Sequence, residues 1–239
     1  MGGRQQLDNE RRVAMRRENA IIGGGAPLPP FAENLVFWAP LTEGDLTDHV
    51  SGVSPAPGTG SCTWDSGMNA YRFVGNQGFA AQRCLIYNIP DGIDFRQSEN
   101  YNFSIFAKIL IVNCNATTDF AMLGSGIMEN KDGISVFSIG ESHRFNTSTN
   151  NPVSLGSWHE LCMTRGTRDV LFYVDKSLSR SSYWDDTNYK PFNIAKAVEV
   201  GANKYISVGN VTYSYTFNAY IKDVRIYDRV LSVSEVAQL

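Results

Sequence analysis

The stretch NAYIKDVRIYDRVLSVSEVAQL, residues 218–239, decides the fold of this chain. Its first half is rich in the aromatic and β-branched residues that strands favour. In strict alternation one face of that strand carries Ile221, Asp223, Arg225 and Tyr227, and the other carries Lys222, Val224 and Ile226. Its second half predicts a helical turn from Ser232 to Ala237, because Glu235 stands three residues after Ser232 as a capping box requires.

The sequence before this segment continues as short apolar runs separated by turn residues. The segment SWHELCMTRGTRDVLFYVD, residues 157–175, predicts a hairpin around Gly166-Thr167-Arg168. Similar runs lie at Leu35–Pro40, Ala70–Phe73, Gly78–Ala81, Tyr101–Val112, Ala121–Gly124, Gly133–Ile139, His159–Arg165, Asp169–Val174 and Tyr205–Val208. Many short strands without a repeat of fixed period are typical of an all-β sandwich, and they exclude solenoids and propellers.

Four segments, in this order, resemble the laminin-G-like, concanavalin A-like jelly-roll domains. They are NLVFWAPLTEGDLTDHVSG at 34–52, GMNAYRFVGNQGFAA at 67–81, the hairpin at 157–175 and the segment at 218–239, of which the last is the most specific. The resemblance implies a two-sheet antiparallel jelly-roll sandwich over residues 31–239. The family commonly has a glycine after the aspartate of the hairpin, where this chain has Lys176, so we expect a difference in that turn. Many such domains are binding modules, and some relatives are glycosidases.

Residues 1–30 differ from the rest of the chain in charge and composition. They carry five arginines against three acidic residues, a net charge of +2, which leaves −5 for residues 31–239. Helix formers fill residues 4–20, and a Gly/Pro linker follows at 21–30. Apolar residues recur at seven-residue spacing at Leu7, Ala14 and Ile21. We predict a short N-terminal helical arm that docks on a partner or on copies of itself.

The overall composition excludes several classes of protein. The chain has 239 residues, 43% of them hydrophobic and 19% charged, so we expect a buried core rather than disorder. The net charge of −3 argues against nucleic acid as a partner. No apolar run reaches the roughly 18 residues that span a bilayer, and no secretory signal is present, so we expect cytoplasmic synthesis without membrane insertion. The four cysteines fit no zinc or redox motif, and their pairing stays open: Cys62, Cys84, Cys114 and Cys162.

The sequence predicts no catalytic site. Glycoside hydrolysis needs two carboxylates about 5–10 Å apart. A strand-borne pair would appear as Glu-x-Asp-x-Glu, which is not present, and the adjacent Asp185 and Asp186 would face opposite sides of a strand. A structural role with a satisfied hydrogen bond suits His159 better than a catalytic one. The chain also lacks a serine nucleophile elbow, a phosphate loop and a dinucleotide fingerprint.

Calcium is the one cofactor that the resemblance suggests. The loop that ends at Asp48 could meet the strand that carries Asp223, and related domains often bind calcium at such positions. The alternative is that Asp48 caps a turn while Asp223 pairs with Arg225 or a backbone amide. The sequence leaves both possibilities open.

Two segments combine aromatic and short polar residues, as sugar recognition requires. The first is CTWDS around Trp64, and the second is SYWDDTNY at residues 182–189. The candidate ligand-binding residues are Trp64, Tyr183, Trp184, Asp185 and Asn188. An alternative role for Trp184 is to plug one end of the sandwich, and we expect the two tryptophans at positions 38 and 158 in the core.

These features favour a non-catalytic module that binds or decorates glycans. The expected partners are a glycan or cell-surface polysaccharide, other structural proteins through residues 1–30, and further copies of the chain as a homo-oligomer. A phage virion, with the module on its head or tail fibre, would combine such an arm with the missing export signal. The alternatives are a glycoside hydrolase or lyase that acts on bacterial polysaccharide, and a purely structural sandwich in a capsid or fibre.

Overall fold

The computed structural model describes thirteen stretches of the chain, from Leu28 to Leu239. They are residues 28–56, 62–73, 85–93, 102–113, 120–126, 135–140, 144–145, 153–166, 169–183, 195–200, 203–207, 210–214 and 218–239. The predicted arm up to residue 27 and the predicted strand Gly78–Ala81 lie outside these stretches. Within them, no helix has both the length and the apolar character that a membrane crossing needs.

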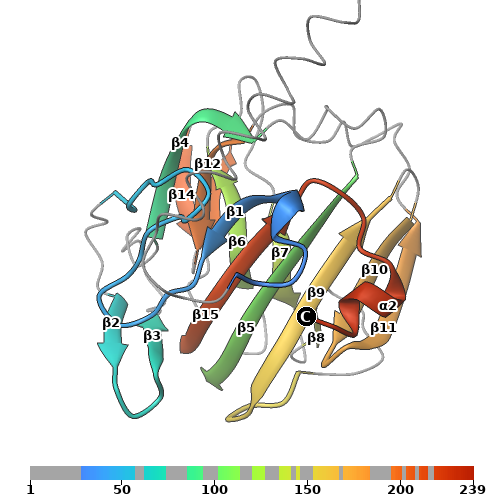
Figure 1. Ribbon diagram of the computed structural model, residues 1–239. Helices are drawn as coiled ribbons and strands as arrows, with labels where there is room; N and C mark the ends of the chain where they lie inside the picture. The colour runs from blue at the N-terminus through green and yellow to red at the C-terminus, as the bar shows by residue number, and fades with distance from the viewer. Residues whose placement is uncertain are drawn as a thin grey trace, which may run out of the picture.

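Eight strands form one large antiparallel sheet (Figure 1). They are β1 (Leu35–Ala39), β2 (Cys62–Asp65), β3 (Ala70–Phe73), β5 (Phe103–Asn113), β9 (Trp158–Arg165), β10 (Asp169–Val174), β11 (Ser177–Tyr183) and β15 (Asn218–Tyr227). The order across the sheet is β11-β10-β9-β5-β15-β3-β2. One edge of β15 is shared, because β3 pairs with residues 219–221 and β1 with residues 224–227.

A second antiparallel sheet packs against the large one, and β6 and β7 are seen behind β15 and β5 in Figure 1. Its order is β4 (Leu85–Ile93), β12 (Ala195–Val200), β6 (Phe120–Gly126), β7 (Ser135–Gly140) and β8 (Arg144–Phe145). A separate hairpin joins β13 (Asn203–Ser207) to β14 (Asn210–Ser214). The short helices are η1 (Ala32–Asn34) and α2 (Val233–Val236). The predicted all-β, two-sheet antiparallel sandwich is therefore confirmed.

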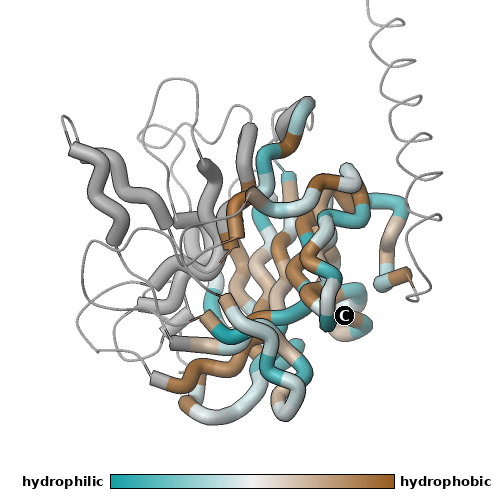
Figure 2. The backbone as a smooth tube through the Cα atoms, turned by 90° about the vertical axis from the view of Figure 1, so that its left-hand side faces the viewer, coloured by the Kyte–Doolittle hydropathy of each residue, from teal (hydrophilic) through white to brown (hydrophobic). Residues whose placement is uncertain are grey.

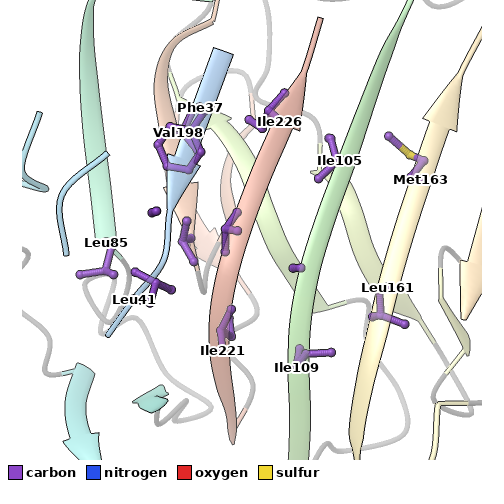
Figure 3. Close-up of a cluster of buried hydrophobic side chains, with 14 of the residues drawn as sticks. Phe37, Leu41, Leu85, Ile105, Ile109, Leu161, Met163, Val198, Ile221 and Ile226 are labelled. Atoms are coloured by element: carbon purple, nitrogen blue, oxygen red, sulfur yellow. The ribbon is translucent and has the colours of Figure 1, made fainter. Parts of the chain in front are cut away.

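The main core lies between the two sheets (Figure 3). The large sheet contributes Ile105, Ile109 and Leu161, and the second sheet contributes Tyr87 and Val198. Phe37 of β1 meets Tyr87 edge to face, with 5.0 Å between the ring centroids. In Figure 2 hydrophobic (brown) and more polar (white and teal) residues follow one another along the coloured backbone, as burial of one strand face predicts.

A β-bulge in β15 changes the face to which its residues point. The pairing with β5 shifts between Lys222 and Arg225, and Asp223 has a φ of 57°. The extra residue moves Val224 and Ile226 onto the same inner face as Ile221. The expected strict alternation, which grouped Ile221 with Arg225, is therefore wrong beyond Lys222.

The hairpin of β9 and β10 is confirmed, and the turn that follows it is tight. Asp175 and Lys176 join β10 to β11 with φ values of 50° and 66°. Both residues adopt the left-handed backbone that two-residue hairpin loops require and that glycine adopts most easily. Lys176 thus takes this conformation without being a glycine.

The predicted capping box at the C-terminal turn is also confirmed. The Ser232 hydroxyl accepts from the backbone N–H of Glu235 at 3.4 Å, and the Glu235 carboxylate accepts from the backbone N–H of Ser232 at 2.8 Å. Arg229 donates to both oxygens of the same carboxylate at 2.7 and 2.9 Å. These contacts fix α2 against the end of β15.

Candidate functional site

The outer face of the large sheet has a covered half. There α2 and the residues just before β1 lie over a second apolar cluster, as Figure 1 shows for α2 in front of β9 and β10. The cluster consists of Leu35, Trp38, Val50, Phe106, Cys162, Tyr173, Tyr227, Leu231 and Val236, with Phe31, Ala32, Leu171 and Leu239 packed against it. The Tyr227 hydroxyl donates to the carbonyl of Pro30 at 3.1 Å, which holds the incoming chain on this half.

The other half of the same face, here called the open half, carries polar and aromatic side chains. In the described stretches neither helix lies over it (Figure 1). Alternation along β5 shows the change, because Phe106 is in the covered cluster and Lys108 is half-buried. Further along the same face Leu110 is buried in a smaller cluster and Val112 is exposed. The open half consists of Asp65, Arg72, Lys108, Trp158, Glu160, Tyr220 and Lys222. Tyr220 is itself buried there, in a small cluster with Ala70 and Leu110 against which Trp158 packs.

Strand register arranges these residues in two rows across the sheet. In the first row Trp158 stands opposite Leu110, and Tyr220 stands between Leu110 and Arg72. In the second row Lys108 stands between Glu160 and Lys222. Residues that are directly opposite on one sheet face are close enough to interact. The open half therefore combines an aromatic row with a charged row.

The charged row leaves one lysine without a carboxylate among the described residues. Lys108 Nζ lies 2.5 Å from the Glu160 carboxylate, and Lys176 Nζ lies 3.6 Å from the other oxygen. Lys222 Nζ instead lies over the Trp158 ring, 4.1 Å from its centroid. Burial, and next the ammonium of Lys108, lower the pKa of Lys222.

The far end of the aromatic row is fixed by hydrogen bonds. The Tyr220 hydroxyl donates to one oxygen of Asp65 at 2.9 Å. The other oxygen accepts from the backbone N–H groups of Gly67 and Met68 at 3.0 and 3.1 Å. The hydrogen bond from Tyr220 is the largest of the effects that lower the pKa of Asp65. The Arg72 guanidinium lies 6.0 Å from the centroid of the Tyr220 ring.

The predicted ligand-binding residues do not gather in the described structure. Trp64 is half-buried against the main core, where its ring lies 5.2 Å from that of Tyr71. Tyr183 ends β11 opposite Asp169. Trp184, Asp185 and Asn188 lie outside the described stretches, so their roles stay predictions.

Asp48 and Asp223, the predicted calcium ligands, both contact Trp38. Asp48 is buried and accepts from the backbone N–H groups of Trp38, Val50 and Ser51 at 2.9, 3.1 and 3.2 Å, and from the Ser51 hydroxyl. Asp223 accepts from the Trp38 indole N–H at 3.3 Å, and Arg225 donates to both of its oxygens. Protein donors thus engage all four carboxylate oxygens, an arrangement that does not fit a calcium ion as it stands.

Metal and cysteine chemistry have little support in the described stretches. No group of three or more His, Cys, Asp or Glu side chains is placed there to hold a metal. Calcium binding at Asp48 and Asp223 would require the protein donors of their carboxylates to move away, and it stays a prediction. Cys62 and Cys162 are both free thiols, while the other two cysteines lie outside these stretches.

His159 has a hydrogen-bond partner on each ring nitrogen. Nε2 lies 2.8 Å from the hydroxyl of Ser154, and Nδ1 lies 2.8 Å from one oxygen of Asp175. The other oxygen of Asp175 accepts from the backbone N–H of Glu160 at 2.9 Å. The chain of contacts ties the loop before β9 to the turn after β10. Its order is also that of a serine, histidine and aspartate triad.

Sequence reasoning missed the two lysines of the open half and misplaced its tryptophan. Trp38 is buried as expected, but Trp158 is only half-buried: it packs against a small buried cluster on the open half and not in the main core. The apolar run around Trp158 gave no sign of which side of its strand would be covered. The signal that was available is the alternation of Lys108 with buried residues on β5.

Comparison with known proteins supports the fold. A family model described as the concanavalin A-like lectin/glucanases superfamily matches residues 97–237. The chain matches no curated protein sequence.

Two solved structures are similar over most of this chain. Trypanosoma rangeli sialidase, in complex with 2,3-difluorosialic acid, has a TM-score of 0.60 at 16% identity, over 99% of this chain and 38% of that one. The binding domain of botulinum neurotoxin serotype G has a TM-score of 0.59 at 16% identity, over 85% of this chain and 50% of that one.

Botulinum neurotoxin type C, whose cell entry depends on interaction with two ganglioside molecules, is also similar. Its TM-score is 0.58 at 14% identity, over 86% of this chain and 50% of that one. This chain thus spans between 38% and 50% of the length of these three structures. At these identities the likeness shows the fold alone.

Proposed function

This chain belongs to the concanavalin A-like lectin/glucanases superfamily, and on that premise we propose that it is a non-catalytic carbohydrate-binding module. Its binding surface is the open half of the large sheet. The neurotoxin and sialidase neighbours, whose descriptions name gangliosides and sialic acid, support a glycan as the partner.

The observation that carries this proposal is the aromatic row of the open half. Pyranose rings present C–H faces that pack on aromatic side chains, while their hydroxyls need polar partners. Trp158 supplies a half-buried ring at one end of the row, and Asp65 and Arg72 supply an acceptor and a donor at the other. Cross-strand neighbours on a rigid sheet are held in register, so little ordering is needed on binding.

The test is glycan binding by the full-length chain on a glycan array, followed by calorimetry. We expect Trp158→Ala to weaken binding about tenfold or more, the size of effect that an interface hot spot shows. Leu178→Ala is the control, because Leu178 is 53% exposed on β11, away from the open half. If correctly folded protein bound no glycan, the structural alternative, a sandwich that fills space in a capsid or fibre, would be favoured.

We place the module in a larger assembly, such as the head or tail fibre of a phage, with residues 1–30 as its anchor to other structural proteins. The contact between Tyr227 and Pro30 supports this, because it brings the incoming chain to the covered half. An anchor there leaves the open half facing outward. Light scattering should find that the full-length chain is a homo-oligomer, or co-sedimentation should find it bound to virions. Either association should be lost when residues 1–27 are removed. A monomer in both cases, with no virion association, contradicts the anchor.

The absence of catalysis is part of the proposal, and the two carboxylates of the open half support it. Glu160 is paired with two lysines, and Asp65 accepts three hydrogen bonds, so neither is placed as an unengaged acid or base. Incubation with bacterial polysaccharides should release no new reducing or unsaturated ends. Turnover that disappeared in Glu160→Gln would establish the glycosidase or lyase alternative instead.

One specific observation favours a second candidate, ester hydrolysis by Ser154. The hydroxyl is exposed, and His159 and Asp175 stand behind it in the order that activates a serine nucleophile. A fluorophosphonate probe would then label wild type but not Ser154→Ala, and p-nitrophenyl acetate would be hydrolysed. Without labelling at Ser154, the three residues serve only to tie the two loops together.

A further inference from the structure

The open half carries more positive charge than the chain as a whole. It contains three cations, Arg72, Lys108 and Lys222, and two carboxylates, Asp65 and Glu160. These leave an excess of one positive charge, whereas the chain has a net charge of −3. The two lysines stand directly opposite each other on β5 and β15. Like charges in that position repel each other and destabilise the pair.

The two lysines differ in how their charge is compensated. Lys108 is paired with the Glu160 carboxylate at 2.5 Å. Lys222 has no ion pair within the described stretches, and its ammonium lies on the Trp158 ring. The neighbouring carboxylate of Asp223 is engaged by both Arg225 and Trp38. Of the two lysines, Lys222 is thus the one that an incoming anion can approach.

The position of Lys222 also sets a condition on any sugar that stacks on Trp158. The ammonium occupies a face of the ring, so the sugar must displace it and lose the cation–π contact. A neutral sugar offers nothing that compensates for this loss. A sugar with a carboxylate offers an ion pair to the displaced ammonium, and charge-assisted hydrogen bonds of this kind are the stronger ones.

We propose that the ligand of the open half is an acidic glycan, whose sugar carboxylate binds Lys222 while its ring stacks on Trp158. This inference rests on the proposed function, since it names the class of glycan for the same surface. Lys222 is then the residue that selects acidic over neutral sugars. The carboxylate can belong to a uronic acid or to a sialic acid, because both present the same charge to the ammonium.

The experiment compares acidic probes with neutral partners of the same length on the full-length chain. The probes are oligogalacturonate against its methyl ester, and sialyllactose against lactose, each measured by calorimetry at two salt concentrations. We expect the wild type to bind at least one acidic probe about tenfold more tightly than its neutral partner, the lower end for a hydrogen bond to a charged group. The preference should shrink at the higher salt concentration.

The variant Lys222→Met tests the assignment of the residue. It should weaken binding of the acidic probe about tenfold and leave the neutral probe unchanged or tighter, because the ring is no longer occupied by a cation. Lys176→Met is the matched control, since it removes a lysine that contacts the same Glu160 but not Trp158. It should leave the preference intact.

The outcomes separate the inference from the function on which it rests. Equal binding of acidic and neutral probes, or an equal loss of both in Lys222→Met, would overturn the acidic preference while the carbohydrate-binding proposal stands. An equal effect of Lys176→Met would reduce the preference to bulk charge and so overturn the role of Lys222. If the chain bound none of the probes, the result would contradict both proposals.

Discussion

The covered and open halves of the large sheet share the strands β5, β9 and β15 but differ in whether another element covers their outer face. In the covered half Phe106 and Tyr227 are buried under α2, and in the open half Lys108 and Lys222 stand half-buried on the same strands, β5 and β15. Burial of the first group makes a second core outside the sandwich. The difference shows that one face of a sheet can be apolar and covered at one end and charged at the other, depending on which residues alternate along each strand. The first end contributes to stability, and the second is the one that we propose for recognition.

The largest difference between the halves should appear in the free energy of unfolding. Phe106→Ala should lower it by about 3–5 kcal/mol, because Phe106 is 1% exposed and its removal leaves a cavity under the covered half. Val112→Ala, on the same strand but 38% exposed, should change it by less than about 0.5 kcal/mol. Chemical denaturation of the two variants measures both values. Equal losses would mean that the open half is buried as well, and would break the comparison.

Asp48→Ala should be the next most damaging change, at about 2–3 kcal/mol, because buried backbone donors lose their acceptor. The donors are the N–H groups of Trp38 and Val50, both members of the covered cluster. Thermal unfolding monitored by tryptophan fluorescence checks the value. A loss below 0.5 kcal/mol, within the range of surface substitutions, would show that the loop does not support the covered half.

The pH dependence of Asp48 has a definite sign. Burial raises the pKa of its carboxyl in the folded chain above the ordinary value near 3.8. The folded state therefore holds this proton more tightly than the unfolded state, and the contribution of Asp48 to stability falls as pH rises from about 3.8 through the folded pKa. Wild type should lose stability relative to Asp48→Asn across that window. A parallel dependence in both proteins would contradict the assignment.

Glu235→Gln should cost about 1 kcal/mol at neutral pH, because it weakens both the capping box and the pairing with Arg229. The hydrogen bond from Arg229 is the largest of the effects that lower the pKa of Glu235 to about 2. The contribution of this carboxylate is thus present above pH 4.5 and is lost as pH falls towards 2, the opposite sense to Asp48. Equilibrium unfolding at pH 7 and pH 2 separates the two states. A difference that persisted at pH 2 would exclude the charge as its cause.

The smallest change in the free energy of unfolding is expected in the open half, and it is a gain where the earlier changes are losses. Lys222→Met should leave the free energy of unfolding unchanged or raise it by up to about 0.5 kcal/mol, because it removes the repulsion with Lys108. Denaturation at low and high salt measures it, and the gain should shrink as salt screens the pair. A loss above about 1 kcal/mol would mean that Lys222 contributes to stability, which sharpens the comparison in favour of a structural role.

Parts of the fold were predictable because they depend on local spacing. The capping box of Ser232 and Glu235, and the strands Ala70–Phe73 and Asp169–Val174, depend only on near neighbours in the sequence. The strand β11 was missed because its sequence, SLSRSSY, is polar, as an edge strand permits. The bulge at Asp223 was missed because it lies where β3 ends and β1 begins along one edge of β15.

The candidate site was harder to predict because its residues meet only across strands. Lys108, Trp158 and Lys222 lie in three separate segments, and register alone brings them together. An apolar run such as the one around Trp158 shows that a strand is present, but it does not show which of its faces another element will cover. Trp64 illustrates the same limit, since its strand faces the main core at that position.

Phe31 and Leu239 lie against the same buried cluster of the covered half. A fusion partner, an affinity tag or a sensor chip attached through Leu239 would therefore approach the covered side and leave the open half facing the solution. The same attachment point on every copy would give an immobilised layer of uniform orientation. The domain is in that sense suited to multivalent display, in which weak binding by one copy raises the effective concentration of its neighbours at the same surface.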